Sequence, residues 1–169
     1  MNVEVRIISL GGGHVSLFRK VGFRNVKRVP AVDYRRESPE NLYKQGKITI
    51  NAMDTWSGGH RKWSREFVGG GAVGLQQSMI EVLSRDRDDK IWTLMCEEDC
   101  IPEHNLHTLV SKLIQTYDLC DFDIVSIGPY VFASKPSCIS GFGYPQKAFF
   151  GCHCLLVPPS AHSKLVDKL

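Results

Sequence analysis

The sequence predicts one α/β domain with a mixed, mostly parallel central sheet flanked by helices. Short apolar segments of strand length alternate with segments in which apolar residues recur every three or four positions. Two of the expected strands end abruptly, the first in glycines and a later one in acidic residues. The chain has 169 residues, 43% of them hydrophobic, which is enough for one buried core.

The first half of the chain contains two expected strands and a long polar segment. Residues 3–10 begin with alternating apolar and charged side chains and continue as a mainly apolar run, and three glycines follow. This pattern indicates a buried strand that ends in a turn. A short helix is expected at 14–21 and a strand at 26–29. Residues 31–68 are polar, basic and poorly periodic, so we expect loops there around a small strand at 48–50.

The second half continues the alternation of helices and strands. Its most regular feature is the apolar spacing of 106–117, which predicts an amphipathic helix. The remaining expected elements are a helix at 73–83 after a Gly-rich start, a strand at 91–96, a strand at 124–127, a strand within 148–157 and a terminal helix from about 160.

The formal net charge of +3 is too small to indicate nucleic-acid binding, but the charge is unevenly distributed. Residues 1–68 hold 13 Lys and Arg against six Asp and Glu, whereas residues 69–169 hold eight against 12. A basic half that faces an acidic half suits an anionic ligand held with the help of a cation. We expect no membrane span, because no apolar run approaches about 20 residues.

All six cysteines lie in the second half, mostly among apolar residues, and we expect buried thiols in a reducing compartment. This predicts a cytoplasmic location, or the host cytoplasm if the protein is viral. A zinc cluster of Cys96 and Cys100 with Cys152-His153-Cys154 is the alternative. We do not favour it, because a one-residue gap between two cysteines makes a poor chelate.

Three adjacent carboxylates, Glu97, Glu98 and Asp99, follow the apolar strand at 91–96. In open α/β sheets the carboxyl ends of the strands line the ligand crevice. If the backbone stays extended, Glu97 and Asp99 point to the same side, about 7 Å apart. Carboxylates that converge at a partly buried edge need a cation, and a hard divalent ion such as Mg²⁺ or Mn²⁺ meets that need. The alternative is a solvated acidic turn before the next helix.

Five segments, in order, resemble glycosyltransferase family 25, the family of lipooligosaccharide β-galactosyltransferases and collagen galactosyltransferases. The segments run over nearly the whole chain: Ile7–Leu10 with Arg19 and 28–33 ("INL…R…R-x-PA-x-D"), 71–78 ("G-x-x-G-x-x-x-SH"), 94–102 ("LEDD-x-x-P"), 121–128 ("D-x-D-x-x-x-LG") and 154–161 ("aY-x-I-x-x-x-gA").

The resemblance implies a single GT-A domain, a Rossmann-related fold, over residues 1–169. Residues 1–102 would bind the nucleotide and residues 103–169 would lie on the acceptor side. The implied enzyme transfers a hexose, galactose in the named members, from a UDP-sugar to a glycan or glycoprotein. Manganese or magnesium would be held by Asp99 and Glu97. The implied nucleotide-sugar contacts are Ser9, Leu10, Arg19, Asp33, Gly74, Ser78 and Glu97.

The chain departs from the family pattern at Ala72, Met79 and Glu98. An inverting displacement needs a carboxylate near the acceptor hydroxyl, and the candidate bases are Glu98, Asp121 and Asp123. The chain also stops soon after the last family-like segment, so one alternative is a catalytically silent nucleotide-sugar or glycan-binding module. Another is an NAD-binding domain, suggested by the glycines at 11–13 with Asp33 at the distance expected of a ribose-binding acid.

Overall fold

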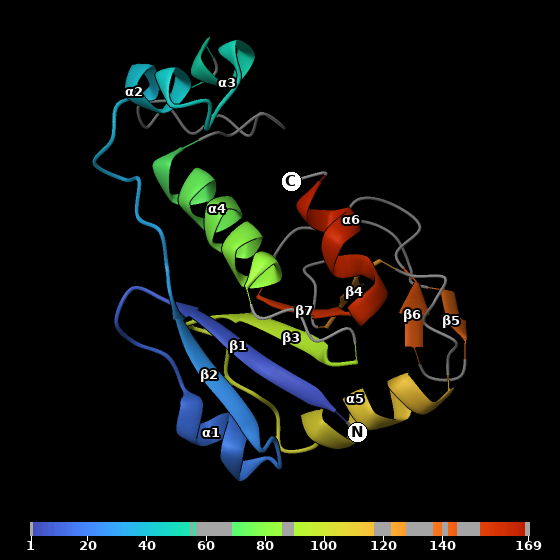
Figure 1. The fold of residues 1–169 in the computed structure, drawn as a ribbon. Coiled ribbons are helices and arrows are strands. Elements are labelled where there is room, and N and C mark those ends of the chain that lie inside the picture. Colours follow the sequence, from blue (N-terminus) through green and yellow to red (C-terminus); the bar gives the residue numbers. More distant parts are fainter. Residues whose placement is uncertain are drawn as a thin grey trace.

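A computed structural model of the protein describes residues 2–54, 56, 69–85, 90–116, 123–127, 137–139, 142–144 and 153–167. These residues form a central sheet with helices on both faces (Figure 1). The sheet consists of β1 (Val3–Ser9), β2 (Asn25–Pro30), β3 (Trp92–Glu97), β4 (Val125–Ser126) and β7 (Cys154–Val157). A separate two-stranded sheet pairs β5 (Ser137–Ile139) with β6 (Phe142–Tyr144).

The order of the strands in the central sheet is β2-β1-β3-β7-β4. Strand β1 is parallel to both β2 and β3, whereas β7 is antiparallel to both of its neighbours, β3 and β4. Four of the strands therefore run in one direction and only β7 runs against them. This confirms the predicted mixed, mostly parallel α/β sheet. Strands from both halves of the sequence share it.

The helices cover the two faces of the sheet separately. On one face lie α1 (Val15–Lys20) and α5 (Leu106–Thr116), whose apolar residues pack against β1, β3 and β7. On the other lie α4 (Gly70–Ser84), the 3₁₀ helix η2 (Pro159–Ala161) and α6 (His162–Val166). All residues of β1 are buried, and successive side chains point to opposite faces of the sheet: Ile7 packs with α1 and α5, and Ile8 packs with α4.

The strand expected at 48–50 is wrong. Residues 48 and 49 instead connect two short helices, α2 (Pro39–Lys44) and α3 (Ile50–Asp54), and Ile50 is the first residue of α3. Both helices begin at a side-chain cap: Ser38 accepts a hydrogen bond from the backbone N–H of Asn41, and Pro39 occupies the first turn of α2. Thr49 Oγ1 likewise accepts from the N–H of Ala52 at 3.2 Å.

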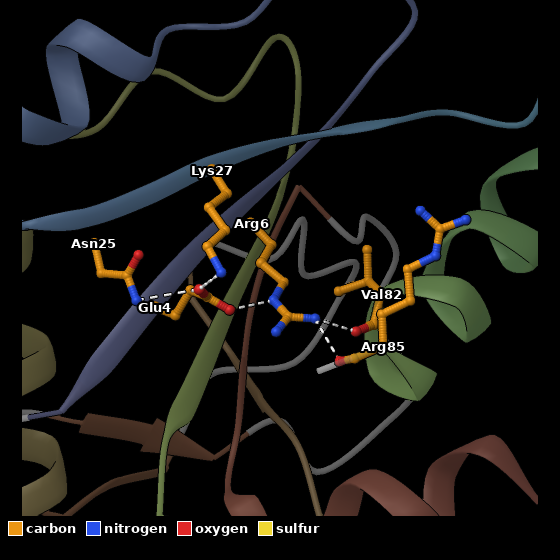
Figure 2. Close-up of polar contacts among 6 residues, drawn as sticks. All are labelled: Glu4, Arg6, Asn25, Lys27, Val82 and Arg85. Atoms are coloured by element: carbon orange, nitrogen blue, oxygen red, sulfur yellow. Dashed lines mark hydrogen bonds and ion pairs between the residues drawn. The ribbon is translucent and has the colours of Figure 1, made fainter. Parts of the chain in front are cut away.

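Two charged side chains of β1, Glu4 and Arg6, are buried under α4 (Figure 2). Arg6 pairs with Glu4 and donates to the carbonyl oxygens of Val82 and Arg85, at the C-terminal end of α4. A guanidinium suits this position because the last carbonyls of a helix have no partner within the helix. Lys27, on β2, adds a second cation, with its Nζ 2.7 Å from a carboxylate oxygen of Glu4. The network therefore joins β1, β2 and α4.

The opposite end of α4 lies against the segment after β2. A Cβ atom at Gly70 would be 2.1 Å from the carbonyl oxygen of Tyr34, and one at Gly74 would be 2.3 Å from that of Val32. Both contacts are shorter than any side chain tolerates, so the close approach requires glycine at these positions. The same chain segment thereby reaches the carboxyl ends of β1 and β3.

Within the residues that the structure describes, no helix has the length and apolarity that a membrane span requires.

Candidate functional site

A pocket of about 270 Å³ opens at the carboxyl ends of β1, β2 and β3. Its walls come from these three strand ends and from the first turns of α4. The residues that line it are Ile8, Leu10, Ala31, Val32, Asp33, Arg35, Gly71, Leu75, Glu97, Glu98 and Asp99. The pocket therefore brings together four of the residues predicted to bind a nucleotide sugar or metal: Leu10, Asp33, Glu97 and Asp99.

Two of the three acids at the end of β3 converge with a histidine. His153 Nδ1 lies 3.5 Å from a carboxylate oxygen of Glu97 and 3.5 Å from one of Asp99. His153 comes directly before β7, and because β7 is antiparallel to β3 its start lies at the edge where β3 ends. The backbone N–H of Glu97 donates to the carbonyl of His153 at 3.1 Å, and this bond holds the two residues side by side.

The donor atoms of this group lie within 4.8 Å of one another, so Glu97, Asp99 and His153 form a group that could hold a metal ion. Burial raises the pKa of Glu97; the charge of His153 opposes that rise and the carboxylate of Asp99 adds to it. Two carboxylates and one imidazole are ligands that Mn²⁺ accepts, and the carboxylates also suit Mg²⁺. The chemistry of the donor set thus fits the predicted kind of ion.

The third acid, Glu98, points toward the glycine loop after β1. Its Oε2 accepts hydrogen bonds from Ser9 Oγ at 3.0 Å and from the backbone N–H groups of Leu10 at 2.9 Å and Gly12 at 3.3 Å. These hydrogen bonds lower the pKa of Glu98, and the bond from Ser9 has the largest effect. Glu98 is therefore an ionised side chain that joins the turn after β3 to the loop after β1.

Asp33 lines the pocket and forms a bidentate ion pair with Arg35. Arg35 Nε and Nη2 donate to the two carboxylate oxygens at 2.8 and 2.7 Å. The hydrogen bonds from Arg35 lower the pKa of Asp33 to about 2. Both side chains are partly exposed, so they are accessible to a ligand in the pocket. Arg35 is a cation among lining residues whose other charged members are all acids.

Ser9, Gly74 and Ser78 lie behind the pocket walls. Ser78 is fully buried; its Oγ accepts from the N–H of Val32 at 2.8 Å and donates to the carbonyl of Gly74 at 2.7 Å. Ser9 Oγ accepts from the N–H of Gly11 at 2.9 Å. In the structure these residues shape the segments that carry Leu10 and Asp33.

Arg19 and Asp123 lie away from the other predicted site residues. Arg19 is exposed on α1, on the face of the sheet opposite α4. Asp123 precedes β4, which runs in the same direction as β3, so it lies at the amino edge of the sheet and not at the edge with the acids. It pairs there with Lys164 of α6 at 2.6 Å.

Sequence reasoning missed His153 and Arg35 as members of this site. From the sequence, His153 enters only the alternative of a cysteine-rich zinc cluster. Its place beside Glu97 depends on the antiparallel pairing of β3 with β7, a contact between distant segments that no local motif signals. Arg35 lies two residues after Asp33, and that spacing was the available signal.

Neither the comparison with protein-family models nor that with curated proteins finds a match for this chain.

Proposed function

We propose that the protein is a metal-dependent glycosyltransferase that moves a hexose from a UDP-sugar to a glycan or glycoprotein acceptor. The observation that carries the proposal is the metal-ligand group of Glu97, Asp99 and His153 beside a pocket at the carboxyl ends of three parallel strands. Ligands of α/β sheets bind at such edges. The volume of about 270 Å³ is close to the lower end of the range for small-molecule pockets.

The pocket offers separate surfaces for the parts of a nucleotide diphosphate. Ile8, Leu10 and Leu75 provide apolar surface for a base. Asp33, an ionised acceptor, suits hydrogen bonds from ribose hydroxyls. Arg35 provides a positive charge for phosphate oxygens. The first turn of α4, at Gly71, provides the positive end of the helix dipole. An anion and a sugar can therefore be accommodated side by side.

A Mn²⁺ or Mg²⁺ ion bound by Glu97, Asp99 and His153 would neutralise the charge that develops on the departing diphosphate. The protein's own contribution is to orient those ligands. Glu97 is held by the β3–β7 backbone pairing, and Glu98 fixes the loop that carries Leu10. Glu98 thus has a positioning role in this proposal.

A second candidate is a nucleotide-sugar-binding module without transferase activity. One observation favours it: of the candidate bases, Asp121 lies outside the described residues, and neither of the two that the structure describes has the surroundings of a general base. Asp123 is paired with Lys164 at the other edge of the sheet, and Glu98 has a lowered pKa and three hydrogen bonds to the loop after β1. Both candidates share the same pocket and the same ion.

Measuring UDP release from UDP-galactose and UDP-glucose, with Mn²⁺ and a panel of glycan acceptors, tests the proposal. The transferase predicts acceptor-stimulated release that EDTA abolishes and Asp99→Asn reduces at least tenfold. The binding module predicts Mn²⁺-dependent UDP binding without release. Absence of both binding and release contradicts both candidates.

A further inference from the structure

Three cysteine side chains converge on the opposite side of the end of β3 from the pocket. Cys96 of β3 and Cys154 of β7 are cross-strand partners, and their sulfur atoms are 3.6 Å apart. Cys100 follows in the turn after β3. The three Sγ atoms all lie within 4.8 Å of one another.

The thiols are separated from the acids by the alternation of side chains along β3. Glu97 lines the pocket, whereas Cys96 and Cys154 belong to the core under α1 and α5. Cys96 and Cys154 are buried, and Cys100 is half-buried and packs against the same core. The cluster is therefore a second group of ligand atoms, distinct in position and in chemistry.

We propose that Cys96, Cys100 and Cys154 bind a Zn²⁺ ion. Tetrahedral zinc with Zn–S bonds of about 2.3 Å needs sulfur atoms about 3.8 Å apart, close to the separation of Cys96 and Cys154. Cys96 and Cys100 have the C-x₃-C spacing of zinc ligand pairs. The third ligand comes from the neighbouring strand, so the site needs no pair of ligands with a one-residue gap. Thiolates select zinc over Mn²⁺ or Mg²⁺.

The ion would join three backbone segments, because Cys96 lies in β3, Cys100 in the turn after it and Cys154 at the start of β7. That turn carries Asp99, and His153 directly precedes Cys154. Zinc would therefore hold the two segments that supply the acid and histidine ligands. Three thiolates leave the fourth tetrahedral position to water or another donor.

The test is metal analysis of the full chain, purified under reducing conditions and dialysed with Zn²⁺. We expect one zinc per chain, with sulfur neighbours at about 2.3 Å by X-ray absorption. Cys100→Ser removes the least buried ligand and should lose the zinc. Two controls should keep it: Cys138→Ser, which changes a cysteine of β5 that is not one of the three proposed ligands, and Asp99→Asn, which changes only the acid group.

Zinc-free wild-type protein, a zinc without sulfur neighbours, or full zinc retention in Cys100→Ser would overturn the proposal. A Cys96–Cys154 disulfide in the reduced preparation, detected by mass spectrometry of peptides, would also contradict it. If Cys100→Ser does not fold, as judged by circular dichroism, the absorption spectrum of the wild-type protein still decides between zinc and no zinc. None of these readouts depends on nucleotide binding or turnover.

Discussion

Glu98 Oε2 accepts a hydrogen bond from the backbone N–H of Leu10 at 2.9 Å, across 88 positions of the sequence. The same oxygen accepts from Ser9 Oγ and from the N–H of Gly12. One carboxylate therefore holds the glycine loop after β1 against the turn after β3. These are two walls of the pocket, so the shape of the candidate site depends on a residue that need not contact the ligand.

Replacing Glu98 with alanine should destabilise the fold and weaken nucleotide binding. The loop loses three hydrogen bonds to a charged acceptor, and because the site is partly open to water we expect a loss of about 1–2 kcal/mol. Urea denaturation measures it. Glu103→Ala, at an exposed glutamate before α5, is the matched control. A Glu98→Ala protein as stable as the control would refute the positioning role.

The buried pair of Glu4 and Arg6 predicts unequal effects of two substitutions. Glu4→Ala leaves Arg6 buried beside α4 without its carboxylate, and removing one partner of a buried pair costs about 3–5 kcal/mol. Lys27→Ala removes a cation that is half exposed, and the loss should stay below about 1 kcal/mol. Equal destabilisation of the two variants, measured by urea denaturation, would contradict this account of the network.

The same network predicts how stability depends on pH. Burial alone would raise the pKa of Glu4, but hydrogen bonds from Lys27 and Arg6 and their charges outweigh it and lower the pKa. A carboxyl with a lower pKa in the folded state stabilises the protein above its unfolded pKa of about 4.5, and this contribution is lost as the pH falls through the folded value. Glu4→Gln should flatten the stability profile below about pH 4.5, in denaturation series at several pH values.

The two close contacts of α4 predict opposite tolerance at neighbouring glycines. In Gly74→Ala the new methyl group would collide with the carbonyl of Val32, so we expect a loss of about 1–3 kcal/mol and displacement of the segment that carries Asp33. In Gly71→Ala it would meet only Arg35 Cγ at 3.9 Å, an ordinary contact. Thermal unfolding should place Gly71→Ala within about 1 kcal/mol of the wild type. The reverse order would disprove the packing argument.

His153 can be tested as a metal ligand by titration with Mn²⁺. His153→Ala should weaken Mn²⁺ binding at least tenfold, which is about 1.4 kcal/mol. His104→Ala changes an exposed histidine before α5 and should leave the affinity unaltered. Isothermal titration calorimetry of both variants measures the difference, and equal affinities would remove His153 from the site.

The sequence predicted the features that depend on local pattern. The apolar runs of β1 and β3, the helical spacing of α4 and α5 and the acids at the end of β3 all follow from periodicity within a few residues. The prediction of a strand at 48–50 was wrong because Thr49 caps α3, which begins at Ile50, and this local hydrogen bond outweighs the β preference of two isoleucines.

Contacts between distant segments could not be predicted. His153 lies near Glu97, and Cys154 near Cys96, because antiparallel β7 pairs with β3. The sequence also did not indicate that Ser78 is buried and holds the segment after β2, because it accepts a hydrogen bond from the backbone N–H of Val32, which is distant in sequence. Sequence order alone does not determine which strand lies next to β3.

The central claim is that an ion held by Glu97, Asp99 and His153 binds the diphosphate of a nucleotide sugar in the adjoining pocket. Calorimetric titration of UDP into the wild-type protein and into Asp99→Asn, each with Mn²⁺ and with EDTA, tests it most directly. We expect UDP to bind the wild type only with Mn²⁺, and Asp99→Asn to lose at least tenfold in affinity. UDP affinity that is the same with Mn²⁺ and EDTA, or unchanged in Asp99→Asn, would contradict the claim.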